Sequence, residues 1–357
     1  MKIVSKYKLI CFSSEYYLFA KGPKLYVSKK VEDKAQSLGT LPVGKVKSIL
    51  GANRYMARGL RLNVRCGTFV DDRIAIVSYH GTIYSVDCKA RTITKEHEFR
   101  TGMNNPLCFE RIQGINGFTD GIYYGEYFLN HNKEQVSIFR RNAEGAWFAV
   151  YTFAAGEIYH IHGIIPCKEQ ECVYILTGDK DSESGIFKAT NDFKNVEEIV
   201  RGKQAYRACA ALPTENGLIY TTDTPLEENY LYYLDFNTKE IKEVIPIAGP
   251  SIYGKRISDT ELLFSTSVEP DSRIEGLRYQ FSYKLGPGVR DNKTHLYYVK
   301  ANGEEITAEE IFTATKDLLP MGAGQFGTIM FPDGNSKNFA TGQSVRKYDN
   351  KTFSIDI

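Results

Sequence analysis

The stretch that decides the fold runs from residue 158 to residue 200 and reads IYHIHGIIPC KEQECVYILT GDKDSESGIF KATNDFKNVE EIV. Short apolar or alternating runs are separated in it by polar residues that favour turns. This pattern is typical of β-strands joined by tight connections, and it carries no helical periodicity. We therefore predict four strands in chain order, at residues 158–164, 172–177, 185–190 and 196–200.

The third of these runs recurs along the whole chain. Each copy is a pair of apolar or aromatic residues followed by a short polar bend and a second apolar strand, and the pairs begin at Leu25, Ile83, Ile138, Ile186, Leu231, Leu296 and Val345. The copies are roughly 45 to 65 residues apart, which is the spacing of propeller blades with loop insertions. Seven copies predict an all-β fold, a seven-bladed β-propeller of four-stranded antiparallel blades, with residues 1–357 forming a single domain.

Three details of this pattern can be tested against a structure. The longest interval contains the polar, Gly-rich stretch 269–287, which we interpret as an inserted loop. Residues 307–312 have a weak helical pattern and predict one or two helical turns. No strand is left over at either end of the chain, so the pattern does not predict how the ring closes.

The composition excludes several classes of function. The net charge is +2 with the two signs well mixed, so we expect neither nucleic acid nor a membrane as a partner. No apolar run approaches the ~18 residues of a spanning helix, and residues 1–8 lack a signal-peptide pattern. The seven cysteines are scattered without a CxxC motif, so a zinc or redox thiol site is not expected. These features favour the reducing cytoplasm and leave the oligomeric state open.

In a propeller, the loops that enter the innermost strands and the loops between second and third strands surround one mouth of the central channel. The richest polar loops of this chain all fall on that face, and binding residues concentrate on such loops. The carboxylates in these loops are Glu126, Asp179, Asp223, Glu227 and Glu269. The other polar candidates on this face are Arg58, Arg61, His80, Gln204, Tyr206, Arg207 and Lys255.

His160 and His162 stand two residues apart on the first predicted strand of the 158–200 stretch. Side chains at i and i+2 share one face of a strand, so both imidazoles are expected to point the same way. A buried imidazole needs a hydrogen-bond partner, a ligand or a metal. One interpretation is a pair of satisfied inter-strand histidines. The other is catalytic, because a neutral histidine beside Arg207 of the next blade suits a general base.

The carboxylates and arginines suggest an acidic sugar as the ligand. Hydrolysis of a glycosidic bond usually needs two facing carboxyl groups, and the mouth loops offer more than two. Arg207 could hold a substrate carboxylate in a bidentate manner, assisted by the other cations of that face. Taken singly, each arginine could equally form a solvated or inter-blade ion pair, and each carboxylate could serve only its own turn.

A metal is the third possibility. The H-x-H pair supplies two ligands on one face, and His80, Asp179 or Asp223 could supply a third. No third ligand stands at a diagnostic spacing. We therefore expect no cofactor and rank a metal held by His160 and His162 below acid–base chemistry.

Two turns between third and fourth strands carry a faint signature. Residues 138–147 read IFRRNAEGAW and residues 189–196 read ATNDFKNV, and both look like eroded copies of the Asp-box pattern Ser-x-Asp-x-Gly-x-Thr-Trp. Together with the repeat, they resemble the sialidase-like (BNR/Asp-box) propeller proteins, and more closely the glycosyl hydrolases of bacterial surface-polysaccharide gene clusters. The closer likeness lies in residues 125–128, 161–164, 177–179 and 220–229. The sialidase motif Phe/Tyr-Arg-Ile-Pro is absent.

The resemblance implies an enzyme that cleaves glycosidic bonds in an acidic bacterial surface polysaccharide or its precursor, as a glycoside hydrolase. Some other propeller enzymes that this chain resembles use His and Tyr at the mouth, which would make it a polysaccharide lyase. A non-catalytic glycan-binding or scaffold propeller is the third alternative. The catalytic candidates are Glu126, His160, His162, Asp179, Tyr206 and Asp223. The substrate-binding candidates are Arg58, Arg61, His80, Gln204, Arg207, Glu227, Lys255 and Glu269.

Overall fold

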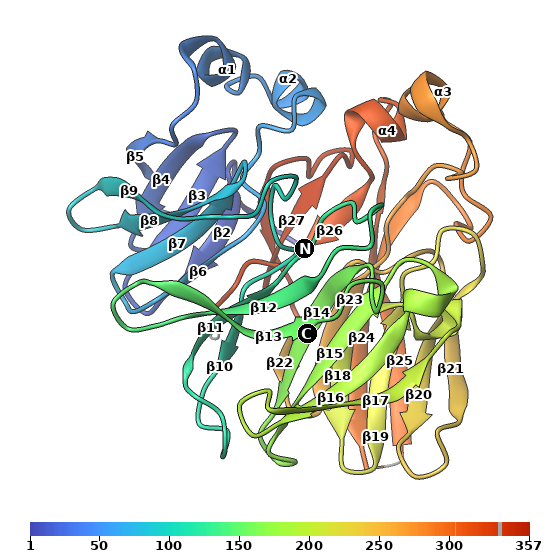
Figure 1. The fold of residues 1–357 in the computed structure, drawn as a ribbon. Helices are drawn as coiled ribbons and strands as arrows, with labels where there is room; N and C mark the ends of the chain where they lie inside the picture. The colour runs from blue at the N-terminus through green and yellow to red at the C-terminus, as the bar shows by residue number, and fades with distance from the viewer. Residues whose placement is uncertain (304, 335–337) are drawn as a thin grey trace.

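The computed structural model describes residues 1–303, 305–334 and 338–357. Its strands form seven four-stranded antiparallel sheets arranged around a central axis (Figure 1). Runs rich in β-branched and aromatic residues form the strands, and Gly, Asn and Asp occupy many of the turns between them. The chain is an all-β seven-bladed propeller, which confirms the fold that the repeat predicted.

Blades one to six follow the chain in order, and within each blade the first strand lies nearest the axis. Blade one consists of β2 (Lys8–Phe12), β3 (Tyr17–Lys21), β4 (Lys24–Ser28) and β5 (Gln36–Thr40), and blade two of β6 (Gly67–Phe69), β7 (Ile74–Tyr79), β8 (Thr82–Asp87) and β9 (Thr92–Glu98). Blade three consists of β10 (Glu110–Ile112), β11 (Gly121–Gly125), β12 (Val136–Arg141) and β13 (Trp147–Phe153), and blade four of β14 (His160–Cys167), β15 (Cys172–Gly178), β16 (Gly185–Thr190) and β17 (Asn195–Arg201). Blade five consists of β18 (Ala208–Thr214), β19 (Gly217–Thr222), β20 (Asn229–Asp235) and β21 (Ile241–Ile247), and blade six of β22 (Tyr253–Ser258), β23 (Glu261–Ser265), β24 (Lys293–Asn302) and β25 (Glu305–Thr315).

Blade seven joins the two ends of the chain. It consists of β26 (Thr328–Met330), β27 (Phe339–Gln343), β28 (Thr352–Ser354) and, as its outermost strand, β1 (Ile3–Ser5). β1 pairs antiparallel with β28, so that Ile3 lies opposite Phe353. The ring therefore closes through an N-terminal strand that completes the last blade, a feature that the repeat pattern did not reveal.

Two expectations about single elements were wrong. The seventh copy of the repeat was assigned to Val345, but residues 344–349 form the connection between β27 and β28. Val345 and Tyr348 are apolar because they are buried in the core of blade seven and not because they lie in a strand. Residues 307–312 belong to β25 and not to a helix, because they pair with β24 along a ladder that one β-bulge interrupts.

In the described part of the chain, four short α-helices lie in the connections. They are α1 (Lys45–Leu50) and α2 (Arg54–Gly59) before blade two, α3 (Gly276–Gln280) between β23 and β24, and α4 (Met321–Gly324) before blade seven. Asn53 caps α2 by accepting hydrogen bonds from the backbone N–H groups of Tyr55 and Met56. α2, α3 and α4 gather at one end of the propeller, at the top of Figure 1. Within the described ranges, no helix is long enough and apolar enough to cross a membrane.

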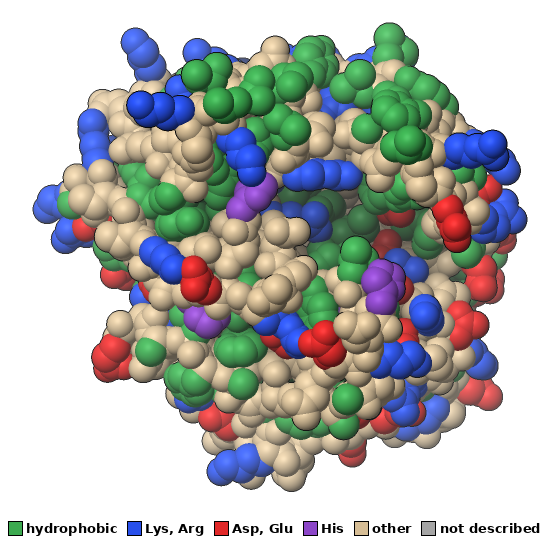
Figure 2. All heavy atoms as spheres, turned by 45° about the horizontal axis from the view of Figure 1, so that its top comes forward, with side chains coloured by type: hydrophobic (Ala, Val, Ile, Leu, Met, Phe, Trp, Pro, Cys, Tyr) green, Lys and Arg blue, Asp and Glu red, His purple; other side chains and the backbone are tan. Residues whose placement is uncertain are grey.

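The apolar core lies between neighbouring blades. Its largest part packs Ile122 and Tyr124 of blade three against Ile164 and Ile175 of blade four. Because the sheets bury both faces in this way, polar side chains near the axis can reach water only through the central channel and its mouths. Figure 2 shows that the face bearing the helices is hollowed at its centre, with basic and acidic side chains around and inside the hollow. This hollow is the predicted mouth.

Candidate functional site

β14 starts at the mouth, and its first residues are arranged around the side chain of His162. The pairing of β14 with β15 shifts between Ile161 and Gly163, so His162 is the extra residue of a β-bulge. Bulges re-aim a side chain relative to a regular strand. Gly178 of β15 leaves the space that the ring needs, because a Cβ at this position would lie 2.3 Å from Cε1 of His162. The position of this imidazole therefore depends on two local features, the bulge that turns the side chain and the glycine that leaves room for the ring.

The two imidazoles meet at a carboxylate. Nε2 of His160 lies 2.9 Å from Nε2 of His162, and each Nε2 lies 3.3 Å from Oδ1 of Asp179, which follows β15. Both histidines are 2% exposed, whereas the Asp179 side chain is 33% exposed toward the mouth. Burial lowers the pKa of His162 and outweighs the raising effect of Asp179. The prediction that the two histidines point the same way is met by this geometry.

Blade five brings a cation and a second carboxylate to this cluster. Nη2 of Arg207 lies 3.0 Å from Oδ1 of Asp179 and 3.4 Å from Oδ2 of Asp223, and Nη1 donates to the backbone carbonyl of Asp179. The buried Nε of Arg207 has no hydrogen-bond partner within the described part of the chain. Cys209 donates to Oδ2 of Asp223 at 3.5 Å. Arg207 thus bridges two carboxylates and keeps one donor unused.

Glu269 is the third carboxyl group of the mouth. It lies in the connection between β23 and β24, the insertion that the sequence predicted, and it is 8% exposed. Burial and the charge of Asp223 raise the pKa of Glu269 to about 8, although Ser267 donates a hydrogen bond to it and Arg207 lies near. At neutral pH this group is therefore mostly a protonated acid, while Asp179 beside Arg207 is in a setting that favours its charge.

Tyr127 is a mouth residue that sequence reasoning missed. Its ring lies against the His160 imidazole, with centroids 4.1 Å apart, and within 6.1 Å of the His162 ring. Burial raises the pKa of Tyr127, and so does the charge of Asp179. The available signal was its position in the sequence, directly after Glu126 in the polar loop 125–130.

Glu126 turns away from the cluster. Its carboxylate accepts a hydrogen bond of 2.8 Å from the backbone N–H of Ser137 in β12 and lies 3.5 Å from Nη1 of Arg100, which lies in the connection between β9 and β10. Only its backbone reaches the mouth, where the carbonyl accepts from Ile161 N. Tyr206 lies in the short 3-10 turn Gln204–Tyr206 and packs in the core between blades four and five. The structure thus places these two catalytic candidates in structural surroundings.

The substrate-binding candidates are also divided. Arg58 is fully buried in an ion-pair network with Asp317 and Asp349. Lys255 lies deeper in the channel, over the Phe12 ring, and its pKa is lowered to about 8 by burial. The remaining candidates lie on the mouth rim: Gln204 donates to Asp179 O and Asp181, His80 contacts the backbone carbonyl of Arg61, Arg61 donates to Gly322 O, and Glu227 is exposed.

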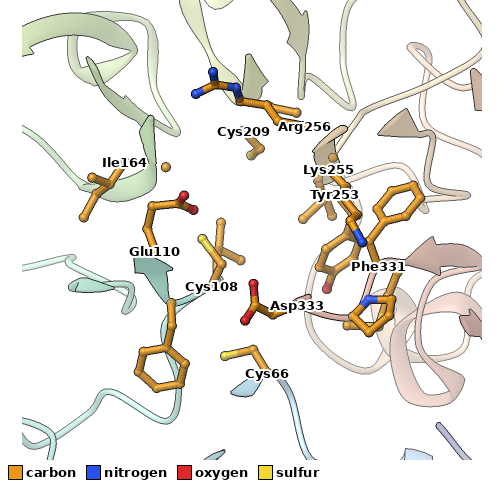
Figure 3. A pocket seen from close by; sticks show the side chains of 18 of the residues that line it. Cys66, Cys108, Glu110, Ile164, Cys209, Tyr253, Lys255, Arg256, Phe331 and Asp333 are labelled. Atoms are coloured by element: carbon orange, nitrogen blue, oxygen red, sulfur yellow. The ribbon is translucent and has the colours of Figure 1, made fainter. Parts of the chain in front are cut away.

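Beneath the mouth the channel continues as a cavity of about 260 Å³. In Figure 3, the side chains of Cys66, Cys108, Glu110 and Asp333 point into it, the first from beside β6, the next two from the start of blade three and the last from beside β26. Burial, together with the charge of Asp333, raises the pKa of Glu110 to about 8. Burial also raises the pKa of Cys66 to about 12, so this thiol is protonated at neutral pH. All seven cysteines are free thiols.

Among the residues that the structure describes, two trios of side chains have donor atoms close enough to hold a metal ion. One is His160, His162 and Asp179, and the other is His162, Cys209 and Asp223. A His₂Asp set with water-accessible positions is a common ligand set for a catalytic divalent ion. Of the third ligands that the sequence offered, Asp179 lies within reach of both imidazoles at once.

Known proteins resemble this chain in fold. No family model and no curated protein matches it. Among solved structures, a chain of the mitotic checkpoint complex matches with a TM-score of 0.53 and 9% identity over 99% of this chain and 90% of that one. An oligogalacturonate lyase in complex with manganese matches with a TM-score of 0.48 and 10% identity, over 92% and 87%. A calcium-binding regucalcin from Agrobacterium tumefaciens matches with a TM-score of 0.46 and 9% identity, over 89% and 96%. At such identities the likeness concerns the propeller fold alone.

Proposed function

We propose that this propeller is a carbohydrate-active enzyme that cleaves glycosidic bonds in an acidic polysaccharide, of the bacterial surface class that the Asp-box resemblance indicates. The observation that carries the proposal is the presence of two carboxyl groups, Glu269 and Asp223, in one open mouth. Glu269 is held protonated by burial, and Asp223 lies beside Arg207. A protonated carboxylic acid and a second carboxyl group are the two groups that glycoside hydrolysis uses.

Each residue has a definite role in this proposal. Glu269 is the general acid that protonates the leaving oxygen of the glycosidic bond. Asp223 is the second carboxyl group, acting as the base for water or as the nucleophile, and Arg207 holds it in place. Arg61 and Arg65 bind the acidic group of the sugar, because their described partners are a carbonyl oxygen and the Tyr253 ring and not carboxylates.

A lyase is the second candidate, and one contact favours it. The Tyr127 ring lies 4.1 Å from the His160 ring, which brings a phenol and an imidazole together at the mouth. In a lyase, such a pair would abstract a proton beside the sugar carboxylate and protonate the leaving oxygen. The product would then carry a double bond, which a hydrolysis product lacks.

The test is incubation of the full chain with a panel of uronate-containing and neutral oligosaccharides. Hydrolysis is expected to release reducing ends from acidic substrates without the absorbance near 235 nm that an unsaturated product shows. Glu269→Gln is expected to lower turnover by about 10²–10⁴-fold. Glu126→Gln is the matched control, because its carboxylate is engaged by Ser137 and Arg100 away from the cluster, and it should retain turnover.

Three outcomes would contradict the hydrolase. Absorbance near 235 nm would assign the lyase. Saturable binding of acidic oligosaccharides without any cleavage would assign a glycan-binding propeller. Equal losses in Glu269→Gln and Glu126→Gln would remove Glu269 from its role as the acid.

A further inference from the structure

Two hydrogen bonds fix the protons of the histidine pair. Nδ1 of His160 lies 3.0 Å from the carbonyl oxygen of Phe128, and Nδ1 of His162 lies 3.1 Å from the carbonyl oxygen of Ala208. A carbonyl oxygen can only accept, so each Nδ1 must carry a proton. In a neutral imidazole the other nitrogen then presents a lone pair. Both Nε2 atoms are therefore acceptors.

These two lone pairs point at each other and at a carboxylate. The Nε2 atoms are 2.9 Å apart, and each is 3.3 Å from Oδ1 of Asp179. Three acceptors at such distances, two of them buried, repel one another unless a positive charge stands between them. Arg207 does not supply it, because among the described residues its side chain donates to Asp179 and Asp223 and not to an imidazole.

We propose that His160, His162 and Asp179 bind one divalent first-row transition-metal ion through the two Nε2 atoms and the carboxylate. Metal–ligand bonds to such atoms are about 2.0–2.2 Å, which places ligands of one ion roughly 3 Å apart. The spacings of 2.9 and 3.3 Å match this geometry. Each Nδ1–H donates to a backbone carbonyl, which is the usual way in which the ring of a metal-binding histidine is oriented.

The local fold supports this trio more than its neighbour. The bulge at His162 and the space left by Gly178 direct the imidazole toward His160 and Asp179. Arg207 contacts a carboxylate of both trios, Oδ1 of Asp179 at 3.0 Å and Oδ2 of Asp223 at 3.4 Å, but in the alternative trio of His162, Cys209 and Asp223 the Cys209 thiol also donates to Oδ2 of Asp223 at 3.5 Å, so that two of its three donor groups already engage each other. The remaining coordination positions of an ion in the first trio face the mouth, because the Asp179 side chain is 33% exposed there.

The metal site deepens the proposed function, and it rests on that function only in its last step. Open positions on the ion would bind a substrate oxygen beside Asp223 and Glu269, and the histidines would then be ligands and not acid–base groups. The binding of the ion itself follows from the geometry of the three side chains. The experiment therefore measures metal binding without reference to any glycan.

The test is titration of the untagged, EDTA-treated full chain with Co²⁺, followed by competition with Zn²⁺. We expect one Co²⁺ per chain, a visible absorption band from nitrogen and oxygen ligands, and a rise in the melting temperature with metal concentration. Asp179→Asn and His162→Gln should weaken binding by at least about tenfold. His131→Gln is the matched control, because His131 contacts Tyr159 nearby and lies outside the trio.

The proposal is overturned if the wild-type chain binds neither ion at millimolar concentration. It is also overturned if Asp179→Asn binds as tightly as the wild type; this variant should fold, since its side chain is partly exposed. A proton shared between the two Nε2 atoms, seen by imidazole NMR and unaffected by added metal, would overturn it as well. Metal binding without cleavage of any glycan would contradict the proposed function alone, and cleavage without metal binding would contradict this inference alone.

Discussion

Arg58 and Arg207 each hold two carboxylates, and the difference between these two arginines separates structure from function. Arg58 is fully buried, and all five of its N–H groups have acceptors: Asp317, Asp349 and the carbonyl oxygen of Gly324. Arg207 bridges Asp179 and Asp223 at a mouth open to water, and its Nε has no described partner. The first network is complete, whereas the second leaves groups for a ligand to satisfy.

The complete network ties distant parts of the ring together. Arg58 lies in α2 before blade two, and its acceptors lie before and within blade seven, next to the closure by β1. Buried polar groups that are fully paired specify one arrangement, whereas unpaired ones need another reason to exist. Completeness of pairing, more than charge or burial, therefore identifies the mouth as the candidate site.

The largest effect is expected from Arg58→Ala. Removing one partner of a buried ion pair leaves poorly compensated charge, here mainly on Asp349, because Asp317 keeps Lys316 at 2.6 Å, and it costs about 3–5 kcal/mol of unfolding free energy. Denaturant unfolding measures this loss, and turnover per folded molecule should be unchanged. A variant that unfolds normally but has lost activity would break the comparison, because it would place Arg58 in the site.

Arg207→Ala should show the reverse. Loss of the bridging guanidinium is expected to lower turnover by about 10²–10³-fold, as for removal of one charge-stabilising donor. The cost in unfolding free energy should be on the order of 1 kcal/mol, because water reaches the Asp179 side chain once the guanidinium is gone. Urea unfolding and turnover are measured for both variants. Arg58→Ala is expected to lose mainly stability, and Arg207→Ala mainly turnover.

Sequence alone could not separate these arginines. Both arginines follow polar loops on the same predicted face. The acceptors of Arg58 lie more than 250 positions away in the sequence, and Arg207 is paired with Asp179 of the neighbouring blade four. Long-range partners of this kind leave no local pattern. The same limit explains Glu126, whose engagement by Arg100 lies in another connection of the ring.

The fold was readable because it repeats locally. Alternation and turn residues reveal strands one at a time, and the 158–200 stretch gave blade four to within a few residues. The pattern failed at Val345, because a buried apolar residue in a connection has the same sequence pattern as a residue in a strand. It also failed at β1, because a strand of three residues is too short to show alternation. At the site, the H-x-H spacing was visible in the sequence, but the bulge that turns His162 and the role of Gly178 were not.

The two networks should also respond to pH in opposite directions. The pKa of Glu269 is raised to about 8, so its contribution to stability is present below its unfolded pKa near 4.5 and is lost as the pH rises toward 8. Burial raises the pKa of Asp317, but hydrogen bonds from Arg58 and Lys316 outweigh it and lower the pKa below 3.8. The contribution of Asp317 is therefore present above about 3.8 and lost at lower pH.

Melting temperatures between pH 3 and pH 9 test this difference. Glu269→Gln should remove part of the decline between pH 4.5 and pH 8, because its amide does not ionise, and it should leave the acid limb in place. Asp317→Asn should remove part of the acid limb only. If Glu269→Gln leaves the alkaline decline unchanged, Glu269 is not held protonated and loses its assigned role as the general acid.

The smallest effect is expected from Tyr127→Phe, and it bears on the choice between hydrolase and lyase. The ring of Tyr127 lies 4.1 Å from that of His160, and phenylalanine preserves this contact. If Glu269 and Asp223 carry the reaction, the phenol has no proton to transfer, and turnover should change less than about threefold, which corresponds to less than 1 kcal/mol. Tyr127→Ala is the companion variant, because it removes the ring itself and should lower turnover further by freeing the imidazole. If turnover falls as strongly in Tyr127→Phe as in Tyr127→Ala, the hydroxyl takes part in the reaction. The incomplete network at the mouth would then belong to a lyase and not to a hydrolase.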